Sequence, residues 1–293
     1  MMLTITTPTY NRAYTIVNCY NSLLRQTSKQ FTWMIIDDGS TDNTEEVVQE
    51  WIKEAKIDIR YYKKINGGKA SALNMGIGLM DTPYAVCLDS DDYFTDTAVE
   101  QALIELEKVK DNEKVCGILA LRNHEDGSVL GGREIPATYD MVAAEDILIK
   151  ENLRTEFICF YKTTILKDFR FPEYAGEKFV PPSWMMFAIT RDYKYKVSHD
   201  RFCVCEYIAD GLTKNKSKVI LKNPRGYSAA KLWYFNLSTS IKLTAKHGIM
   251  YDCGCILAKD KDWLKNTTRK GWAIILYPAA HIVYLKRLSK ARV

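Results

Sequence analysis

Three aspartates follow a short apolar run in the first third of the chain and offer the clearest candidate chemistry. Asp89, Asp91 and Asp92 stand in Leu-Asp-Ser-Asp-Asp, at the end of the apolar residues 84–88. Carboxylates this close repel one another, and a hard divalent cation with oxygen ligands removes that conflict. We therefore predict that they bind Mn²⁺ or Mg²⁺ beside substrate phosphates. The alternative is a solvated turn in which Asp92 or Thr95 caps a helix.

A second acidic segment, at residues 37–42, follows another apolar run. An aspartate at the end of a strand can accept a hydrogen bond from a base or a ribose hydroxyl. We assign that role to Asp38, with Asp37 as the weaker candidate. The remaining residues suit a tight turn and then a helix cap, which are Gly39 for the turn and Ser40, Thr41 or Asp42 for the cap.

Two glycines and a lysine form a third segment, Asn-Gly-Gly-Lys-Ala-Ser at 66–71. The spacing is not that of a Walker motif, because Lys63 stands where the first glycine of that motif would be. Glycines that open a helix expose backbone N–H groups, and Lys69 adds a positive charge, so we predict contact with a diphosphate. The alternative is a glycine loop with a solvated lysine.

Strands and helices must alternate over the first 125 residues to position these segments. The predicted strands are 3–6, 31–36, 57–63, 84–88 and 115–121, and the predicted helices are 14–25, 42–54, 68–80 and 96–110. This order predicts an α/β fold with a mostly parallel central sheet and helices on both faces. A ligand then binds at the carboxyl ends of the strands, where all three segments fall.

The alternation loosens after residue 125. The elements that we expect there are a hairpin turn at Asp126-Gly127, strands at 154–161 and 195–207, and helices at 224–247 and 260–293.

Four short motifs stand in a fixed order near the start of the chain. They are Thr-Pro-Thr-Tyr-Asn-Arg at 7–12, Asp-Asp-Gly-Ser-Thr-Asp at 37–42, Gly-Gly-Lys-Ala-Ser-Ala-Leu-Asn at 67–74 and Leu-Asp-Ser-Asp-Asp at 88–92. Together they closely resemble the family 2 glycosyltransferases with the GT-A fold, over residues 1–95 and more loosely to 225. The resemblance implies a GT-A domain at 1–225, with a nucleotide-sugar half at 1–125 and an acceptor half at 126–225. A C-terminal helical region follows at 226–293.

The resemblance also implies a role for each matching residue. The residues that would bind the nucleotide-sugar are Thr7, Pro8, Tyr10 and Asp38 at the base, Lys69 and Asp89 at the diphosphate and ribose, and Arg12, Gly68, Asn74 and Ser90 elsewhere in the donor site. Asp91 and Asp89 would ligate the metal. Asp92 would lie near the donor sugar as a catalytic group.

Inversion by a single displacement is a further implication of the resemblance. A carboxylate then removes the proton of the attacking hydroxyl, while the cation neutralises charge on the departing UDP. In relatives the base lies well beyond the aspartates, and we assign Glu177 first and Glu173 second. Lys178 stands where relatives have a second acid. The alternative for both glutamates is a surface carboxylate paired with Lys178 or Arg170.

The composition narrows the range of partners. A formal net charge of +5 on 293 residues is modest, which does not favour nucleic acid as a partner. The eight cysteines stand largely in apolar runs, as reduced cysteines do, and the Cys-x-Cys spacing at 203–205 and 253–255 is not that of a zinc site. Neither a signal peptide nor an apolar run of 18 residues is evident, so we expect a cytoplasmic protein.

The C-terminal segment has a different character. Residues 272–285 are rich in aromatic and aliphatic side chains, and Lys286 and Arg287 follow them. Such a segment suits an interfacial helix at an anionic leaflet. The alternative is a helix that docks on the domain.

Together these features predict a glycosyltransferase of the hexosyl or N-acetylhexosaminyl type. We expect it to take a sugar from a UDP-sugar and pass it to a saccharide or lipid-linked saccharide during capsule, exopolysaccharide or lipopolysaccharide synthesis, at the inner face of the plasma membrane. One alternative is a nucleotidyltransferase-like enzyme, although such enzymes place a glycine-rich loop where this chain has residues 7–12. The other is a non-catalytic nucleotide-sugar-binding scaffold, which Lys178 leaves open.

Overall fold

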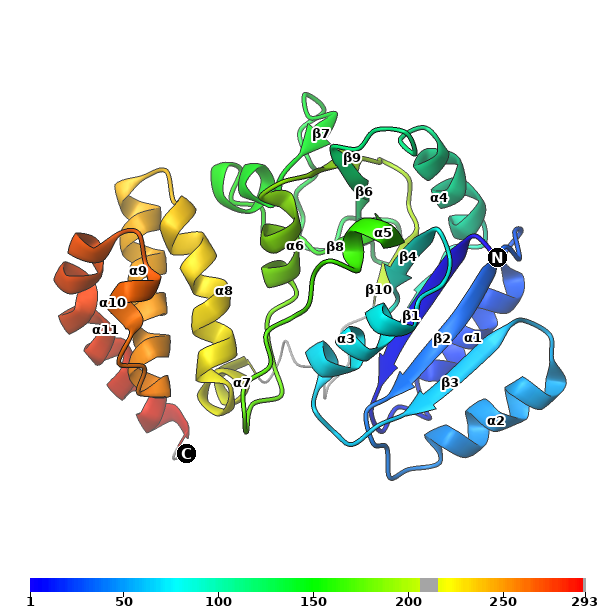
Figure 1. The fold of residues 1–293 in the computed structure, drawn as a ribbon, viewed down its shortest axis with the longest axis horizontal. Helices are drawn as coiled ribbons and strands as arrows, with labels where there is room; N and C mark the ends of the chain where they lie inside the picture. The colour runs from blue at the N-terminus through cyan, green and yellow to red at the C-terminus, as the bar shows by residue number, and fades with distance from the viewer. Residues whose placement is uncertain (206–215, 292–293) are drawn as a thin grey trace. The chain divides into compact units, whose positions relative to one another are not determined.

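The computed structural model describes residues 1–205 and 216–291, and these form two compact units (Figure 1). Within the described residues, the first unit consists of 1–143, 153–170 and 188–205. The second unit consists of 144–152, 171–187 and 216–291. The second unit therefore takes residues from both sides of position 225.

An eight-stranded sheet forms the centre of the first unit, in the order β3-β2-β1-β4-β8-β6-β9-β7. Its strands are β1 (Leu3–Thr9), β2 (Phe31–Asp37), β3 (Ile59–Lys63), β4 (Tyr84–Cys87), β6 (Val115–Leu121), β7 (Met141–Val142), β8 (Phe157–Lys162) and β9 (Lys194–Val197). The first four strands of that order run parallel, as do β6 and β9, whereas β8 and β7 are antiparallel to their neighbours. A separate two-stranded sheet pairs β5 (Asp92–Phe94) with β10 (Cys203–Cys205).

Helices cover both faces of the parallel half of the sheet, as the sequence predicted. The helices of this unit are α1 (Ile16–Arg25), α2 (Thr44–Glu54), α3 (Lys69–Leu79), α4 (Ala98–Glu107) and α5 (Thr163–Leu166), and α6 (Ser183–Thr190) crosses the boundary between the two units. Successive residues of a strand point to opposite faces. Trp33 of β2 therefore joins the apolar cluster that contains α1, α2 and α4, and Met34 packs with Ala72 of α3 on the other face.

Three predicted elements are wrong. The helix expected at 260–293 is two helices, Trp263–Asn266 and Lys270–Ala291. The strand expected at 195–207 is two separate strands, β9 and β10, and residues 206–207 lie outside the described residues. The helix expected at 224–247 is divided into α8 (Pro224–Leu237) and α9 (Ile241–Ala258). Ser240 causes the second helix to begin there, because its side chain accepts a hydrogen bond from the Leu243 N–H and caps α9.

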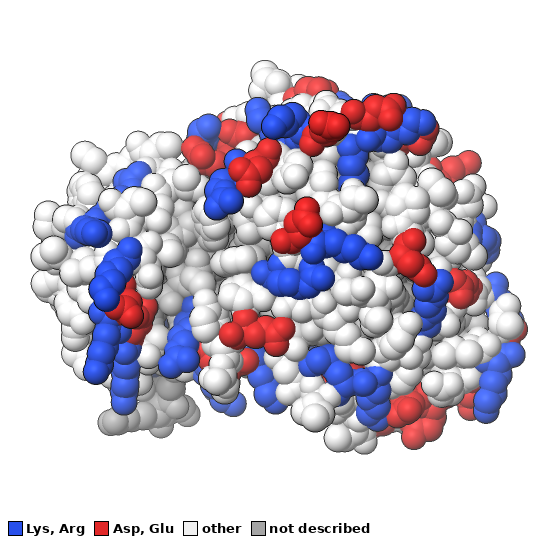
Figure 2. Space-filling view, viewed as in Figure 1, with Lys and Arg blue, Asp and Glu red and all other residues white. Residues whose placement is uncertain are grey.

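The second unit is helical and strongly basic. Its remaining helices are the single π-helical turn at Asp146–Lys150, α7 (Lys216–Lys222), α10 (Trp263–Asn266) and α11 (Lys270–Ala291). Residues 216–291 include fifteen Lys and Arg against three Asp and no Glu, and blue side chains predominate over the C-terminal helices in Figure 2. Among the described helices, none combines the length and the apolar character that crossing a bilayer requires.

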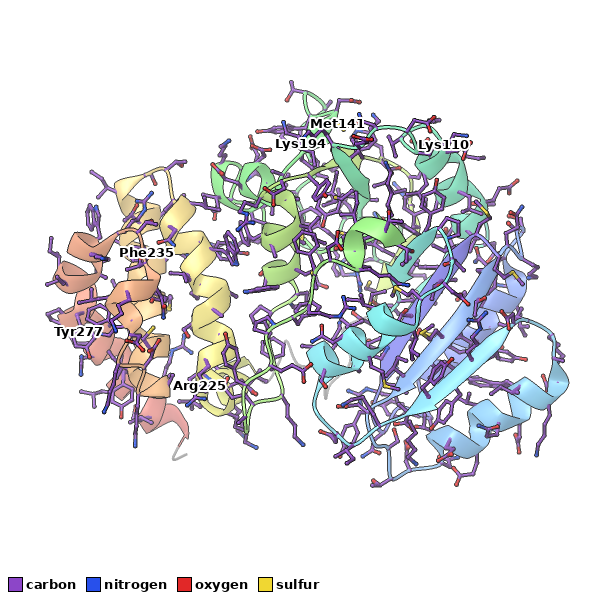
Figure 3. The ribbon with its side chains drawn as sticks, in the orientation of Figure 1. Lys110, Met141, Lys194, Arg225, Phe235 and Tyr277 are labelled. Carbon is purple, nitrogen blue, oxygen red and sulfur yellow. The ribbon has the colours of Figure 1, made fainter. Side chains whose placement is uncertain are left out.

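An aromatic core joins α8, α9 and α11. Phe235 of α8, which is labelled in Figure 3, stacks on Tyr251 of α9 with 5.8 Å between ring centroids. Ala273 and Leu276 of α11 complete the cluster. Gly248 allows this close packing, since a Cβ at that position would lie 2.5 Å from a methyl group of Leu276. On this side, α11 thus packs on α8 and α9 within the second unit.

Candidate active site

The carboxyl ends of four strands meet at one edge of the large sheet. Thr9 ends β1, Asp37 ends β2 and Asp89 follows β4, and these strands are parallel neighbours. β6 points the same way, because β8 lies between β4 and β6 and is antiparallel to both. Arg122, the residue after β6, therefore reaches the same edge, which is where ligands bind in open α/β sheets.

Asn11 locks the loop after β1 to the loop after β2. Its backbone has φ +52°, in the left-handed region that asparagine tolerates better than most residues. The Asn11 N–H donates to the Ser40 hydroxyl at 2.9 Å, and its side-chain oxygen accepts from the Thr41 N–H at 2.8 Å. The sequence analysis missed this residue, although asparagine directly after a strand is a common signal for such a turn.

Asp38 organises the glycine loop. One carboxylate oxygen accepts from the Gly67 N–H at 2.8 Å and from Lys64 Nζ at 2.9 Å, and the other accepts from the Gly68 N–H at 2.6 Å. Gly68 has φ +90°, a conformation that favours glycine, and α3 begins directly after it. The contact of Asp38 with a base stays a prediction, and the contacts present give it a role in shaping the loop.

Asp37 supports the turn after β2. Its carboxylate is fully buried and accepts from the Ser40 N–H at 2.7 Å and from the Tyr61 hydroxyl at 2.5 Å. Burial, together with this carboxylate, raises the pKa of Tyr61. Both oxygens of Asp37 are thus engaged inside the unit, which agrees with our weaker assignment.

The start of α2 differs from one of our expectations. The helix begins after Asn43, whose side chain makes no capping hydrogen bond, so neither Ser40 nor Thr41 is the cap. Asp42 acts at this end instead, because its side chain accepts from the Thr44 N–H at 3.1 Å.

The residues predicted at the base pocket are not equally accessible. Thr7 is fully buried and its hydroxyl accepts from the Trp33 indole N–H at 2.9 Å, so its side chain is not exposed to a ligand. Pro8 is buried as well. Tyr10 is 47% exposed, and Arg12 donates to the Tyr14 hydroxyl at 2.9 Å. Tyr10 is therefore the side chain most available to stack on a base.

Lys69 joins the glycine loop to the aspartates. Its Nζ lies 2.5 Å from a carboxylate oxygen of Asp89. Burial would lower the pKa of Lys69, but Asp89 raises it well above its ordinary value. Burial would likewise raise the pKa of Asp89, but Lys69 and Arg122 hold it well below its usual range. The alternative of a solvated lysine is wrong.

Arg122 is a second residue at this edge that the sequence analysis missed. Its guanidinium donates to Asp92 and, at 3.3 Å, to Asp89, and its Nε donates to the Phe157 carbonyl at 3.1 Å. The side chain is buried and lies 3.5 Å from Cys205 Sγ. A charged residue directly after the apolar strand 115–121 was the available signal.

Asp91 and Asp92 differ in environment. Burial and the charge of Asp89 raise the pKa of Asp91, which is half-buried. Burial raises the pKa of Asp92 to about 7, although Arg122 opposes this shift. The alternative in which Asp92 or Thr95 caps a helix is wrong, since α4 begins after Thr97 with no side-chain capping bond.

The charges here fit a hard divalent cation. Asp91 carries a carboxylate whose ionisation its surroundings disfavour, beside the ionised Asp89, and oxygen-ligated Mn²⁺ or Mg²⁺ would offset that cost. A different group, made of Asp92, Cys203 and Cys205, brings its potential ligand atoms within 4.8 Å of one another. All three residues of that second group are buried, and the Arg122 guanidinium contacts both Asp92 and Cys205 within it.

Glu177, our first candidate for the base, caps a helix. Its two carboxylate oxygens accept from the Arg225 N–H at 3.0 Å and the Gly226 N–H at 2.9 Å, in the first turn of α8. Pairing with Arg170 is not observed, because Arg170 donates instead to the carbonyls of Lys167 and Phe169. Glu173, the second candidate, is exposed.

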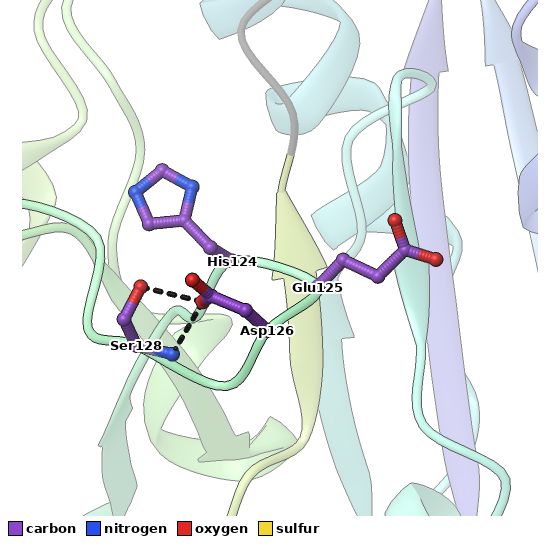
Figure 4. Close-up of a pocket in the computed structure, with 4 residues that line it drawn as sticks. All are labelled: His124, Glu125, Asp126 and Ser128. Atoms are coloured by element: carbon purple, nitrogen blue, oxygen red, sulfur yellow. Dashed lines mark hydrogen bonds between the residues drawn. The ribbon is translucent and has the colours of Figure 1, made fainter.

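A polar hairpin continues from Arg122 at the same edge. His124, Glu125, Asp126 and Ser128 line an open hollow of about 790 Å³ (Figure 4). Asp126 accepts from the N–H and the hydroxyl of Ser128, and Gly127 has φ +82°. The predicted turn at Asp126-Gly127 is thus confirmed.

The sequence model of glycosyl transferase family 2 matches residues 4–169, which is more than half of the chain. The chain therefore belongs to glycosyl transferase family 2, and the resemblance drawn from the four motifs is confirmed. This membership gives no support to the nucleotidyltransferase alternative.

Individual relatives agree with this family. The chain is 38% identical over 130 residues to the chondroitin synthase of Pasteurella multocida strain Pm70. The matched residues are 44% of this chain but 13% of that protein. The TarS fragment 1–349 from S. aureus, solved with UDP-GlcNAc, superposes with a TM-score of 0.59 at 16% identity over 98% of this chain and 92% of that one. A mannosyltransferase from Pyrobaculum calidifontis, solved with GDP-Man and Mn²⁺, gives 0.54 at 18% identity over 97% and 86%. These two structures confirm the GT-A fold.

Proposed function

We propose that this chain transfers a sugar from a UDP-sugar to an acceptor hydroxyl, with inversion, during the synthesis of a cell-surface polysaccharide. The observation that carries the proposal is the Lys69–Asp89 ion pair, which brings the glycine loop and the aspartates together at the ligand-binding edge of the sheet. The polymer synthase and the UDP-GlcNAc complex among the similar proteins support a donor and product of these classes.

In this proposal the donor side of the site uses the residues that the motifs named. Tyr10 stacks on the base, Asp38 holds the glycine loop and the backbone N–H groups near Gly68 face the diphosphate. Arg12 and Ser90 lie in the loops after β1 and β4, Asn74 lies within α3, and these three residues would complete the donor site. Asp91 and Asp89 would hold Mn²⁺ or Mg²⁺, which supplies positive charge against the departing UDP. The Mn²⁺ complex of the mannosyltransferase supports this assignment.

The acceptor hydroxyl must lose its proton to a carboxylate. Glu177 and Glu173 remain the proposed bases. Both oxygens of Glu177 already accept hydrogen bonds from α8, so Glu173 has to be tested with equal weight. The acceptor would be a saccharide or a lipid-linked saccharide.

We also propose that α11 lies on an anionic membrane surface. Five large apolar side chains of this helix are exposed, namely Trp272 at 36%, Ile274 at 58%, Ile275 at 71%, Ile282 at 58% and Leu285 at 60%. A monomer rarely exposes such a stripe without a use for it. The excess of Lys and Arg in residues 216–291 complements anionic headgroups, and attachment there would keep the chain at the inner face of the plasma membrane, where a lipid-linked acceptor would lie.

The experiment that tests the transferase proposal is UDP release from a series of UDP-sugars. We expect release with Mn²⁺ or Mg²⁺, loss with EDTA, and loss in Asp91→Asn. Thermal shifts with UDP, GDP, CDP and ADP, each with Mn²⁺ and with EDTA, measure binding separately. UDP binding without release from any UDP-sugar would favour the scaffold alternative, and the absence of any nucleotide shift would contradict the donor site.

A further inference from the structure

Arg122 gives two of the three aspartates an internal cation. Its guanidinium donates to Asp92 and Asp89, and only a small part of its side chain is exposed. Lys69 supplies the other positive charge, on Asp89. Asp91 makes neither of these contacts. The Asp89 side chain is 20% exposed and its contact with Arg122 is the longer one, at 3.3 Å, whereas the Asp92 side chain is only 7% exposed, so Asp92 is the carboxylate least accessible to a ligand.

Main-chain contacts fix the direction in which Asp92 points. In the small sheet Asp92 pairs with Cys205, and Asn123 bonds to both ends of β10, since its N–H donates to the Cys203 carbonyl and its carbonyl accepts from the Cys205 N–H. Cys19 Sγ donates to the Asp92 carbonyl at 2.8 Å from α1. Residue 92 is therefore held by β10 on one side and by α1 on another, with its carboxylate bonded to Arg122, whereas Asp91, the preceding residue, is half-buried.

We propose that Arg122 is a positioning residue that holds Asp92 out of the ligand set of the cation and leaves Asp91 and Asp89 as its protein ligands. This inference rests on the proposed metal-dependent function. A guanidinium fits the task because it is planar, always charged and offers several N–H donors in a fixed arrangement. It bonds Asp92, Asp89 and the Phe157 carbonyl at the same time, which a lysine ammonium on a flexible stem would not reproduce.

This proposal predicts that removing a side chain of the site increases the affinity for Mn²⁺ instead of lowering it. Replacing Arg122 with methionine keeps most of the apolar volume, removes one positive charge and releases Asp92. The free Asp92 carboxylate can then join Asp91 and Asp89 at the cation. We therefore expect Arg122→Met to bind Mn²⁺ about tenfold more tightly, since a third carboxylate and the loss of a nearby cation both favour a divalent ion. Sugar transfer should nevertheless slow, because the metal is held in a different geometry.

A double-mutant cycle separates this mechanism from a general change of charge. Mn²⁺ binding is measured by electron paramagnetic resonance on the chain alone, for wild type, Arg122→Met, Asp92→Asn and the double variant. We expect Asp92→Asn to change the Kd by less than about threefold and the double variant to lose the gain seen in Arg122→Met. If Arg122→Met increases Mn²⁺ affinity equally in the wild type and in Asp92→Asn, the proposal is overturned.

Asp91→Asn and Arg122→Lys complete the design. Asp91→Asn should weaken Mn²⁺ binding more than about tenfold, and an equal loss in Asp92→Asn would make Asp92 a ligand and overturn the proposal. The comparison of Asp91→Asn with Asp92→Asn therefore tests the proposal even if Arg122→Met fails to fold. Arg122→Lys should have a higher kcat than Arg122→Met and should not show the gain in Mn²⁺ affinity. If Arg122 were merely structural, both substitutions should lower kcat and Mn²⁺ affinity together. Absence of Mn²⁺ binding to the wild type both without and with UDP would instead contradict the proposed function itself.

Discussion

Lys69 and Asp89 form an ion pair with 2.5 Å between Nζ and the carboxylate oxygen, and this contact links the start of α3 to the loop after β4. Their side chains are 29% and 20% exposed. An interaction in this position stabilises the fold and also sets the charge that a diphosphate would meet.

Lys69→Met removes the cation and leaves Asp89 with Arg122 alone. We expect the free energy of unfolding to fall by about 1–3 kcal/mol, because a partly buried carboxylate loses its nearest partner. UDP affinity should fall about tenfold with it. Chemical denaturation and a UDP titration measure the two effects.

Lys63→Met is the matched control. Lys63 pairs with Glu45, and both side chains are more than 40% exposed. An exposed ion pair contributes less than about 1 kcal/mol, so this variant should unfold almost as the wild type does and bind UDP normally. Equal effects of the two substitutions would show that the Lys69–Asp89 contact has no special weight.

Asp38→Asn tests the proposed organisation of the glycine loop. An amide keeps one acceptor oxygen but cannot accept from both the Gly67 and the Gly68 N–H groups and from Lys64. We expect the free energy of unfolding to fall by about 1–3 kcal/mol and hydrogen exchange at the two glycine amides to become faster. Asp81→Asn, at an exposed ion pair, serves as the control. Unchanged exchange at Gly67 and Gly68 would contradict the role that we give to Asp38.

The sequence was sufficient for the parallel half of the sheet because that half is built from local patterns. Each of β1 to β4 is an apolar or alternating run, and each of α1 to α4 has ends within three residues of the predicted ones. Predicting Asp38, Lys69 and the aspartates as one site followed from the rule that the carboxyl ends of parallel strands meet.

The interactions that were missed join residues far apart in the chain. Arg122 lies 33 residues from Asp89, and Glu177 lies 48 residues from Arg225, whose N–H it accepts. No periodicity or spacing encodes such contacts, because they depend on how two separately predicted elements pack. Asp37 shows the same limit: its partner Tyr61 lies on the neighbouring strand, so the sequence could not tell a buried support from a ligand contact.

Glu177→Gln and Glu173→Gln identify the base. Loss of a general base slows a reaction about 10²–10⁴-fold, so one of the two variants should lose kcat to this extent while its UDP and Mn²⁺ affinities stay unchanged. If Glu177 serves only to cap α8, Glu177→Gln should leave kcat within a few-fold and lower the melting temperature instead. If neither variant slows turnover, both assignments are wrong.

Asp252 makes the stability of the second unit depend on pH. Its carboxylate is fully buried in α9, neither oxygen has a hydrogen-bond partner among the described residues, and burial raises its pKa from 3.8 to about 7. The folded state therefore holds the proton more tightly than the unfolded state does. Its contribution to stability is complete below pH 3.8 and is lost as the pH rises through about 7, by at most about 4 kcal/mol.

Asp252→Asn removes this titration and should be more stable than the wild type by about 1–3 kcal/mol above pH 7, with the difference shrinking toward pH 5. Urea unfolding across this range measures it. His247 acts with the opposite sign, since burial lowers its pKa to about 4 and its contribution is lost as the pH falls below 6.5. The difference between variant and wild type isolates Asp252, because His247 is present in both. A pH-independent difference would contradict the assignment.

Ile275→Ser tests the membrane surface of α11. Ile275 is 71% exposed, so serine should leave folding intact while removing apolar area that would enter the bilayer interface. One isoleucine is worth about 1.5–3 kcal/mol of burial, so we expect binding to vesicles containing phosphatidylglycerol to weaken about tenfold or more. Sedimentation with vesicles measures the affinity.

Ile104→Ser on α4 is the matched control, because Ile104 is 54% exposed and lies in the other unit. It should bind the same vesicles as the wild type does. Binding should also weaken with added salt and on vesicles of phosphatidylcholine alone, since the Lys and Arg side chains of residues 216–291 act through electrostatic attraction. If both serine variants behave alike, the exposed stripe does not enter the interface. A dimer that dissociates in Ile275→Ser without any vesicle binding would assign the stripe to a second copy of the chain.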